Sequence, residues 1–167
     1  MKKIFVLSVL VSSMLFLGCK KEDDDVRNPY CGIYTGYLTH TSVRNGNEMS
    51  ETNRTMIGVR KNGDNIKSVT VYYESNGGLL FTTQAMSVTN TPNGDGFCGY
   101  VYESVTKNED DIDVTTTGLP ISDDKDYSCE ISPNKDGVLT LRFVSQKSYM
   151  MHGIEVMETF EFEGERN

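Results

Sequence analysis

The chain contains no tryptophan and only two histidines, four prolines and four cysteines. Two histidines leave little choice of a general base, and there is no Gly-x-Ser-x-Gly segment, so nothing indicates a serine hydrolase of that type. A zinc site would need a scattered ligand set, because the sequence has no Cys-x-x-Cys pair. We therefore expect a protein that is not an enzyme, with no metal site and no cofactor.

Positive charge is also scarce. The chain has 16 lysines and arginines against 24 aspartates and glutamates, which gives a net charge of −8. An acidic chain repels nucleic acid and anionic membrane surfaces, so we expect no nucleic-acid partner. The two acidic segments 108–113 and 123–126 lack the spacing and the glycine of a calcium loop, and we interpret them as solvated loops.

The first 18 residues are predicted to be a signal peptide. A short positive start precedes the apolar run Ile4–Leu17, which has the length of a signal-peptide core and is too short to span a bilayer as a helix. Gly18 and Cys19 follow. This arrangement resembles the bacterial lipobox, although Phe16 stands where leucine is usual. The resemblance implies cleavage before Cys19, lipidation of that cysteine and a membrane partner through the lipid.

Residues 19–29 are predicted to be the lipidated cysteine and an acidic, flexible tether. The charge run Lys20–Asp25 has no apolar residue to bury and is typical of a solvated segment. It also resembles the lysine-plus-acidic signal that directs lipoproteins of Bacteroidetes to the outer face of the outer membrane. That resemblance implies a lipid-anchored protein on the cell surface, and a plain hydrophilic spacer is the alternative.

From Tyr30 onward the sequence predicts short strands that are separated by turn residues. No window carries a helical stripe, although a short helix at 123–126 or 145–151 is left open. Frequent turn signals between strands are typical of an antiparallel sandwich or barrel. The expected strands are 30–41, 55–60, 66–74, 79–89, 97–106, 112–118, 127–132, 138–144 and 154–163.

The two ends of this region carry a family resemblance. The segments Gly32–Leu38 and Met157–Gly164 are similar to the first and last strands of calycin-like lipoproteins of Bacteroidetes, and Gly32-Ile33-Tyr34 stands where lipocalins have Gly-x-Trp. The resemblance implies that residues 30–164 form one all-β domain, a single antiparallel up-and-down β-barrel of about eight strands, lipocalin- or calycin-like. Such a barrel holds side chains or one small ligand inside.

Three cysteines remain after Cys19, an odd number for an oxidising compartment. We predict a Cys98–Cys129 disulfide. If a strand at 112–118 lay between the strands that carry Cys98 and Cys129, these strands would be two spacings of about 4.8 Å apart, too far for a disulfide at mid-strand. Cys31 and His40 do not form a catalytic pair, since an odd separation places them on opposite faces of one strand.

Three residues are candidates for ligand contacts. Tyr100 and Tyr102 share one face of a predicted strand and offer an apolar body with a polar tip, which suits a cavity mouth. Glu158 has the same parity as Phe160 and Phe162 in the last strand, so a regular strand points it inward. The alternative is a β-bulge near Met157 that turns Glu158 outward.

Two functions fit these patterns. In the first, the barrel of a cell-envelope lipoprotein binds a small apolar or amphipathic ligand. In the alternative, the barrel is solid and serves as a non-catalytic interaction module that docks onto another envelope protein or a host protein. The interior volume discriminates between them, because a cavity of a few hundred cubic ångströms with convergent polar groups favours ligand binding.

Overall fold

The computed structural model describes residues 25–91 and 94–167. Among them the only helix is the single 3-10 turn η2 (Asn28–Tyr30), which precedes the first strand. All other regular elements are strands, most of them built from alternating apolar and polar residues. In chain order they are β1 (Gly32–Arg44), β2 (Asn47–Lys61), β3 (Val69–Tyr73), β4 (Leu79–Thr91), β5 (Gly94–Val101), β6 (Ser104–Lys107), β7 (Asp113–Gly118), β8 (Cys129–Pro133), β9 (Leu139–Met151) and β10 (Ile154–Arg166).

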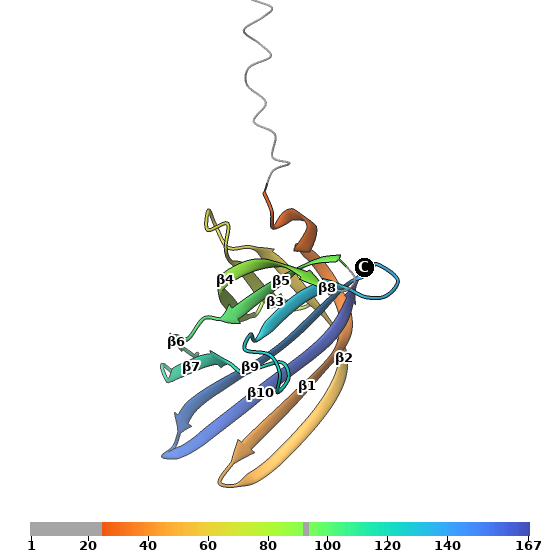
Figure 1. Ribbon diagram of the computed structural model, residues 1–167. Helices are drawn as coiled ribbons and strands as arrows, with labels where there is room; N and C mark the ends of the chain where they lie inside the picture. The colour runs from red at the N-terminus through yellow and green to blue at the C-terminus, as the bar shows by residue number, and fades with distance from the viewer. Residues whose placement is uncertain (1–24, 92–93) are drawn as a thin grey trace, which may run out of the picture.

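Eight of these strands close into a ring. Their order is β10-β1-β2-β3-β4-β5-β8-β9, and β9 pairs back to β10. Every pairing in the ring is antiparallel, and most neighbours are consecutive in the chain. The β6–β7 hairpin stands outside the ring on the free part of β9 (Figure 1). The predicted all-β class and the antiparallel up-and-down barrel of about eight strands are confirmed.

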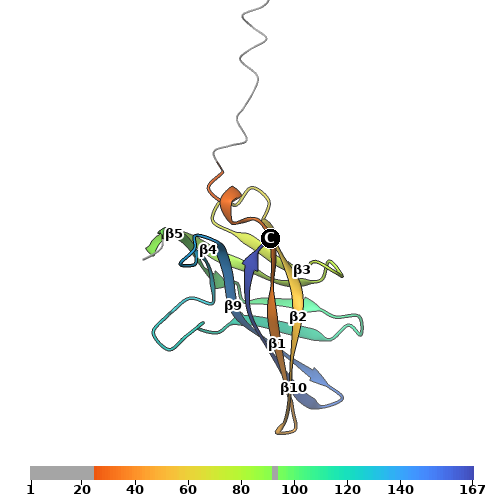
Figure 2. The same cartoon turned by 90° about the vertical axis from the view of Figure 1, so that its right-hand side faces the viewer.

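Two long hairpins, β1–β2 and β9–β10, extend beyond the ring. Strand β2 pairs with β3 only over residues 57–61. Strand β9 pairs with β8 only over residues 139–143, the first five residues of β9. The hairpin tips are Asn45-Gly46 and His152-Gly153, whose four φ angles lie between 51° and 79°. Two consecutive positive φ values are the signature of the tight turn that matches strand twist. Both tips lie at the end of the molecule away from the C-terminus (Figures 1 and 2).

The ring itself is filled by side chains. Tyr34 and Phe97 are fully buried, and Phe143 packs edge-on against Phe81 and stacks on Phe162, with ring centroids 4.9 and 5.6 Å apart. These side chains come from opposite walls of the ring, so they form one continuous apolar core. Burying a side chain of this size contributes roughly 1.5–3 kcal/mol. Most of the buried apolar side chains therefore lie inside the ring of eight strands.

Several strand boundaries differ from the sequence prediction. The predicted strand 97–106 is two strands, because the chain breaks after β5 and β6 pairs with β7 rather than with the ring. The segment 145–151, considered for a helix, is the second half of β9, and it pairs with both β10 and β7. Residues 123–126 form a turn rather than a helix. Strand β2 begins at Asn47, since the Asn45-Gly46 turn pairs it with all of β1.

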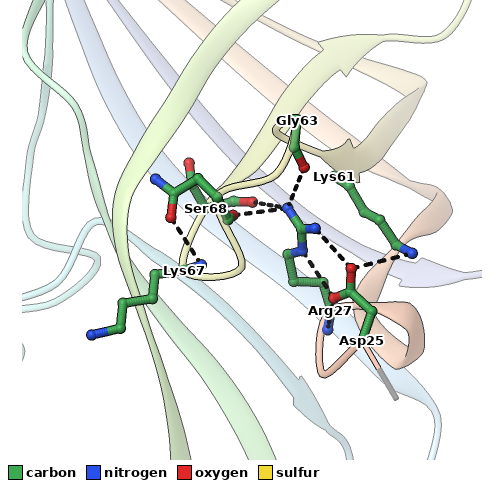
Figure 3. A network of polar contacts seen from close by, with 7 residues as sticks. Asp25, Arg27, Lys61, Gly63, Lys67 and Ser68 are labelled. Carbon is green, nitrogen blue, oxygen red and sulfur yellow. Dashed lines mark hydrogen bonds and ion pairs between the residues drawn. The ribbon is translucent and has the colours of Figure 1, made fainter. Parts of the chain in front are cut away.

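The last residues of the predicted tether belong to the folded domain. Arg27 is only 3% exposed, and its guanidinium donates hydrogen bonds to Asp25 and to the carbonyls of Gly63, Asn65 and Ser68 (Figure 3). The Asp25 carboxylate also lies 3.3 Å from Lys61 Nζ. The flexible boundary predicted at residues 19–29 is therefore wrong for residues 25–29, because this ion-paired cluster packs them on the closed end of the barrel.

The predicted Cys98–Cys129 disulfide is also wrong. Among the described residues there is no disulfide bond. The strands β5 and β8 are direct neighbours, but Cys129 pairs with Gly99, one residue from Cys98. Successive residues face opposite sides of a sheet, so the two thiols point to opposite faces of the barrel wall.

The predicted signal peptide, residues 1–18, and the predicted lipidation site, Cys19, lie outside the described residues. Within 25–91 and 94–167, no helix has the length and apolar character that a bilayer crossing requires.

Candidate functional site

The inward faces of the two long hairpins continue past the core and line a cavity. In β1 the parity of buried Tyr34 and Leu38 leads on to His40 and Ser42, so the same face changes from apolar to polar. The cavity has a volume of about 610 Å³, which lies within the range of small-molecule sites. It is lined by His40, Ser42, Arg44, Asn45, Asn47, Met49, Ser50, Glu51, Met151, Ile154, Val156 and Glu158.

Glu158 points into this cavity. Strand β10 keeps an unbroken register with β1 and with β9 through this region, so there is no bulge near Met157. Met157 is 36% exposed and faces outward, whereas the Glu158 side chain is only 19% exposed. Of the two orientations that the sequence left open, the structure has the inward one.

Three polar groups converge at the floor of the cavity. Glu158 lies directly opposite Ser42 in the β1–β10 register, and its Oε1 atom is 3.5 Å from His40 Nε2. The His40 ring stacks on Phe160 with centroids 4.7 Å apart and an angle of 5° between the planes. This stacking fixes the orientation of the imidazole, so its Nε2 edge is held toward the carboxylate.

Two of these groups are buried without a hydrogen-bond partner. Within the described part of the chain, His40 Nε2 and Ser42 Oγ have no hydrogen bond. An unsatisfied buried polar group costs roughly 1–3 kcal/mol. A ligand group that both donates and accepts hydrogen bonds would satisfy these two atoms beside the carboxylate.

The Glu158 charge acts on further side chains around the cavity. Burial raises the pKa of Tyr73 and of Tyr149, and the nearby Glu158 carboxylate raises both further. Burial lowers the pKa of Lys147, which lies opposite Glu158 on β9, and the Glu158 charge opposes that effect. None of these three side chains lines the cavity, so the influence of the Glu158 charge extends beyond the cavity lining.

The geometry of Ser42, His40 and Glu158 does not match a hydrolase triad. Ser42, His40 and Glu158 are the residue types of a hydrolase triad, but Ser42 Oγ has no hydrogen bond to His40. Both imidazole nitrogens face carboxylates instead, with Nδ1 3.8 Å from Glu51 and Nε2 3.5 Å from Glu158. An activated serine needs a base within hydrogen-bond reach, so this set does not activate Ser42.

Three apolar side chains line the cavity near the hairpin tips. Met49, which is 77% exposed, comes from β2, and Met151 and Ile154 flank the β9–β10 turn. Methionine is flexible and polarisable, so it adapts to ligands of irregular shape. Exposed polar residues, among them Arg44, Asn47 and Glu51, also line this part, so the outer part of the cavity is mixed in character.

The two candidate tyrosines do not join Glu158. Tyr100 lies on the outer wall, 42% exposed, and its hydroxyl donates to Asp126 Oδ2 at 3.4 Å. The charge of Asp126 raises the pKa of Tyr100. Tyr102 follows β5 and lines a separate cavity of about 420 Å³. The two tyrosines do not share a strand face, because β5 ends at Val101, between them.

The sequence analysis missed His40 and Ser42 as partners of Glu158. Their parity with Tyr34 and Leu38 was visible in the sequence, but only the register of β1 on β10 brings them to Glu158. Among the described residues, no group of three or more histidine, cysteine, aspartate or glutamate side chains is arranged to hold a metal ion. The acidic segment after β6 is instead bound to Lys107, whose Nζ lies 2.9 Å from Asp113.

Comparisons of the chain with protein-family models, with curated proteins and with solved structures found no match.

Proposed function

We propose that this protein is a cell-envelope lipoprotein whose barrel binds a small amphipathic ligand. The observation that carries the proposal is the pair of unsatisfied buried atoms, His40 Nε2 and Ser42 Oγ, beside Glu158 at the floor of a cavity of about 610 Å³. A solid interaction module that docks onto an envelope or host protein would have a filled interior, so the cavity supports ligand binding over that alternative.

The chemistry of the lining suggests which end of the ligand enters first. A head group with two hydroxyls supplies hydrogen bonds to Ser42 Oγ, to His40 Nε2 and to the Glu158 carboxylate without adding net charge. The apolar body then lies against Met49, Met151 and Ile154 at the mouth. A medium-chain monoacylglycerol has this division of polar and apolar parts.

The absence of tryptophan allows a site-specific test of this proposal. A Met49→Trp variant of the mature chain, with Cys19→Ser to remove the lipid, carries one indole at the cavity mouth. Titration with monodecanoylglycerol is expected to shift the emission to shorter wavelength with saturation, because the bound chain removes water from the indole.

Removing the polar floor gives the control. Ser42→Ala and Glu158→Gln, each in the Met49→Trp background, are expected to weaken binding about five- to tenfold, since each removes one hydrogen bond worth roughly 1 kcal/mol or more. Thr52→Ala, which removes an exposed hydroxyl on the same hairpin outside the cavity lining, is the matched variant and should bind as the parent does. Equal affinity in all four proteins would refute a polar floor.

The proposed anchor and the cavity lie at opposite ends of the molecule. Asp25, the first described residue, is bound at the closed end, whereas the hairpin tips that line the cavity are at the other end (Figure 1). A lipid on Cys19 would thus leave the cavity mouth facing away from the membrane. We place the protein in the outer membrane, on the cell surface, from the resemblance of the segment after Cys19 to an export signal, with the calycin-like lipoproteins as the family it resembles.

Lipidation is tested by metabolic labelling. We expect the parent protein to take up labelled palmitate and to fractionate with membranes, whereas Cys19→Ser should take up none, because the thiol is the proposed lipid acceptor. Cys31→Ser, which alters a half-buried thiol of the barrel, is the matched control and should be labelled normally. Label in the Cys19→Ser variant would reject the anchor.

A further inference from the structure

A second cavity, of about 420 Å³, lies between the start of β4, the β6–β7 hairpin and β9. Its apolar wall includes Leu79, Phe81 and Tyr102, and hydroxyl side chains and two lysines, Lys107 and Lys147, complete the lining. No carboxylate is among its lining residues. The charged groups that line this cavity are therefore positive, although the whole chain has a net charge of −8.

The two lysines differ in how their charge is compensated. Lys107 is neutralised, with its Nζ 2.9 Å from Asp113 and 3.7 Å from Asp111. Among the described residues, none forms an ion pair or hydrogen bond with the Lys147 ammonium group. Its Nζ atom lies over the Phe160 ring, 5.3 Å from the centroid.

Glu158 acts on the Lys147 charge without forming an ion pair with it. Glu158 lies opposite Lys147 in the β9–β10 register, yet its Oε1 atom is turned toward His40. Burial lowers the pKa of Lys147, which reflects the cost of this desolvated charge. A partly buried cation without a paired anion is a site at which a ligand anion replaces lost hydration.

We propose that this second cavity binds the carboxylate of an organic acid with an apolar body, such as a medium-chain fatty acid, with Lys147 as the counter-ion. Thr116 is opposite Lys147 in the β7–β9 register and supplies a hydroxyl donor to the same carboxylate. The hydrocarbon chain lies against Phe81, which is buried, and against Leu79 and Tyr102, which are half exposed. The site is distinct from the first cavity in both lining and charge.

A Tyr102→Trp variant of the mature Cys19→Ser chain reports on this cavity alone. Titration with decanoate is expected to give a saturable shift in emission, whereas decanol, which lacks the charge, should bind at least tenfold more weakly. In this background Lys147→Gln should weaken decanoate binding at least tenfold, because a hydrogen bond to a charged group is worth roughly 1.5–3 kcal/mol. Lys147→Arg should retain most of the affinity.

The matched control is Lys125→Gln. It removes an ion-paired lysine that lines neither cavity, so decanoate affinity should change by less than about twofold. Calorimetric titration of the Lys147→Gln and parent chains without the reporter substitution checks that the indole itself does not create the site.

Glu158→Gln separates this site from the first cavity. It should strengthen decanoate binding at the Tyr102→Trp reporter, since it removes the negative charge opposite Lys147, although it weakens monodecanoylglycerol at the Met49→Trp reporter. Ser42→Ala should affect only the Met49→Trp reporter. Decanoate binding that is unchanged by Lys147→Gln, or decanol binding as tight as decanoate, would overturn the proposal, whatever the first cavity binds.

Discussion

Replacing Gly36 with valine is expected to prevent the barrel from closing. Gly36 of β1 lies opposite Gly164 of β10, and a Cβ atom at Gly36 would be 2.1 Å from the Glu163 carbonyl oxygen and 2.3 Å from Gly164 Cα. Both obstacles are backbone atoms, so no side-chain rotation relieves the clash. The pair of glycines thus allows a close approach of the first and last strands.

The expected loss is large in relation to the stability of the fold. Overpacking of a core costs roughly 1–3 kcal/mol, and a clash with backbone costs about 4 kcal/mol or more, out of a total of about 5–15 kcal/mol. Urea unfolding of the mature chain measures the change. Tyr37→Val places the same side chain on the next residue, which is 64% exposed and faces outward, and should change stability by less than about 1 kcal/mol. If both variants unfold at the same urea concentration as the parent, the strands do not approach in this way.

Replacing Arg27 with alanine is the second large perturbation. The substitution removes a buried charge from Asp25 and leaves the carbonyls of Gly63, Asn65 and Ser68 without their donor. Breaking a buried ion pair costs roughly 3–5 kcal/mol, so we expect a loss of about 3 kcal/mol in the free energy of unfolding. Arg27→Lys should recover only part, because one ammonium does not reproduce the guanidinium geometry.

Arg60→Ala is the matched control for Arg27→Ala. The Arg60 guanidinium is on the outside of β2, 5.0 Å from the centroid of the Tyr72 ring, and its loss should cost about 1 kcal/mol or less. A loss at Arg27 no larger than the loss at Arg60 would mean that residues 25–29 are not part of the folded domain.

The same cluster sets a pH dependence. Hydrogen bonds from Arg27 lower the pKa of Asp25 well below its ordinary value. A depressed pKa in the folded state stabilises the fold fully above the unfolded value of about 3.9, and the contribution is lost as the pH falls toward the folded value. The difference in unfolding free energy between the parent and Asp25→Asn should therefore be greatest above about pH 4 and should shrink below it.

Local patterns in the sequence predicted many of the strands, but they did not predict the contacts between residues far apart in the chain. Alternation identified the closing strand and the inward parity of Glu158, because a strand buried on one face repeats every two residues. Arg27 escaped prediction, since its acceptors are carbonyls 36 to 41 residues away in the chain. Nothing in a local pattern reveals such a contact.

The cysteine error has a topological cause. From the sequence, a strand at 112–118 could lie between the strands that carry Cys98 and Cys129 and hold them apart. The β6–β7 hairpin instead leaves the ring and pairs with the far half of β9, so β5 and β8 become neighbours. The obstacle to the disulfide is then the opposite facing of the two side chains rather than distance. Likewise, His40 was considered only against Cys31, because its true neighbour is set by the β1–β10 register.

Native mass spectrometry of the mature Cys19→Ser chain with monodecanoylglycerol tests the central claim most directly. We predict a one-to-one adduct that is lost in an Ile154→Trp variant, because the larger indole replaces a side chain of the cavity lining. A parent chain that stays at its sequence mass at saturating monodecanoylglycerol, or an adduct that persists equally in Ile154→Trp, would contradict ligand binding in this cavity.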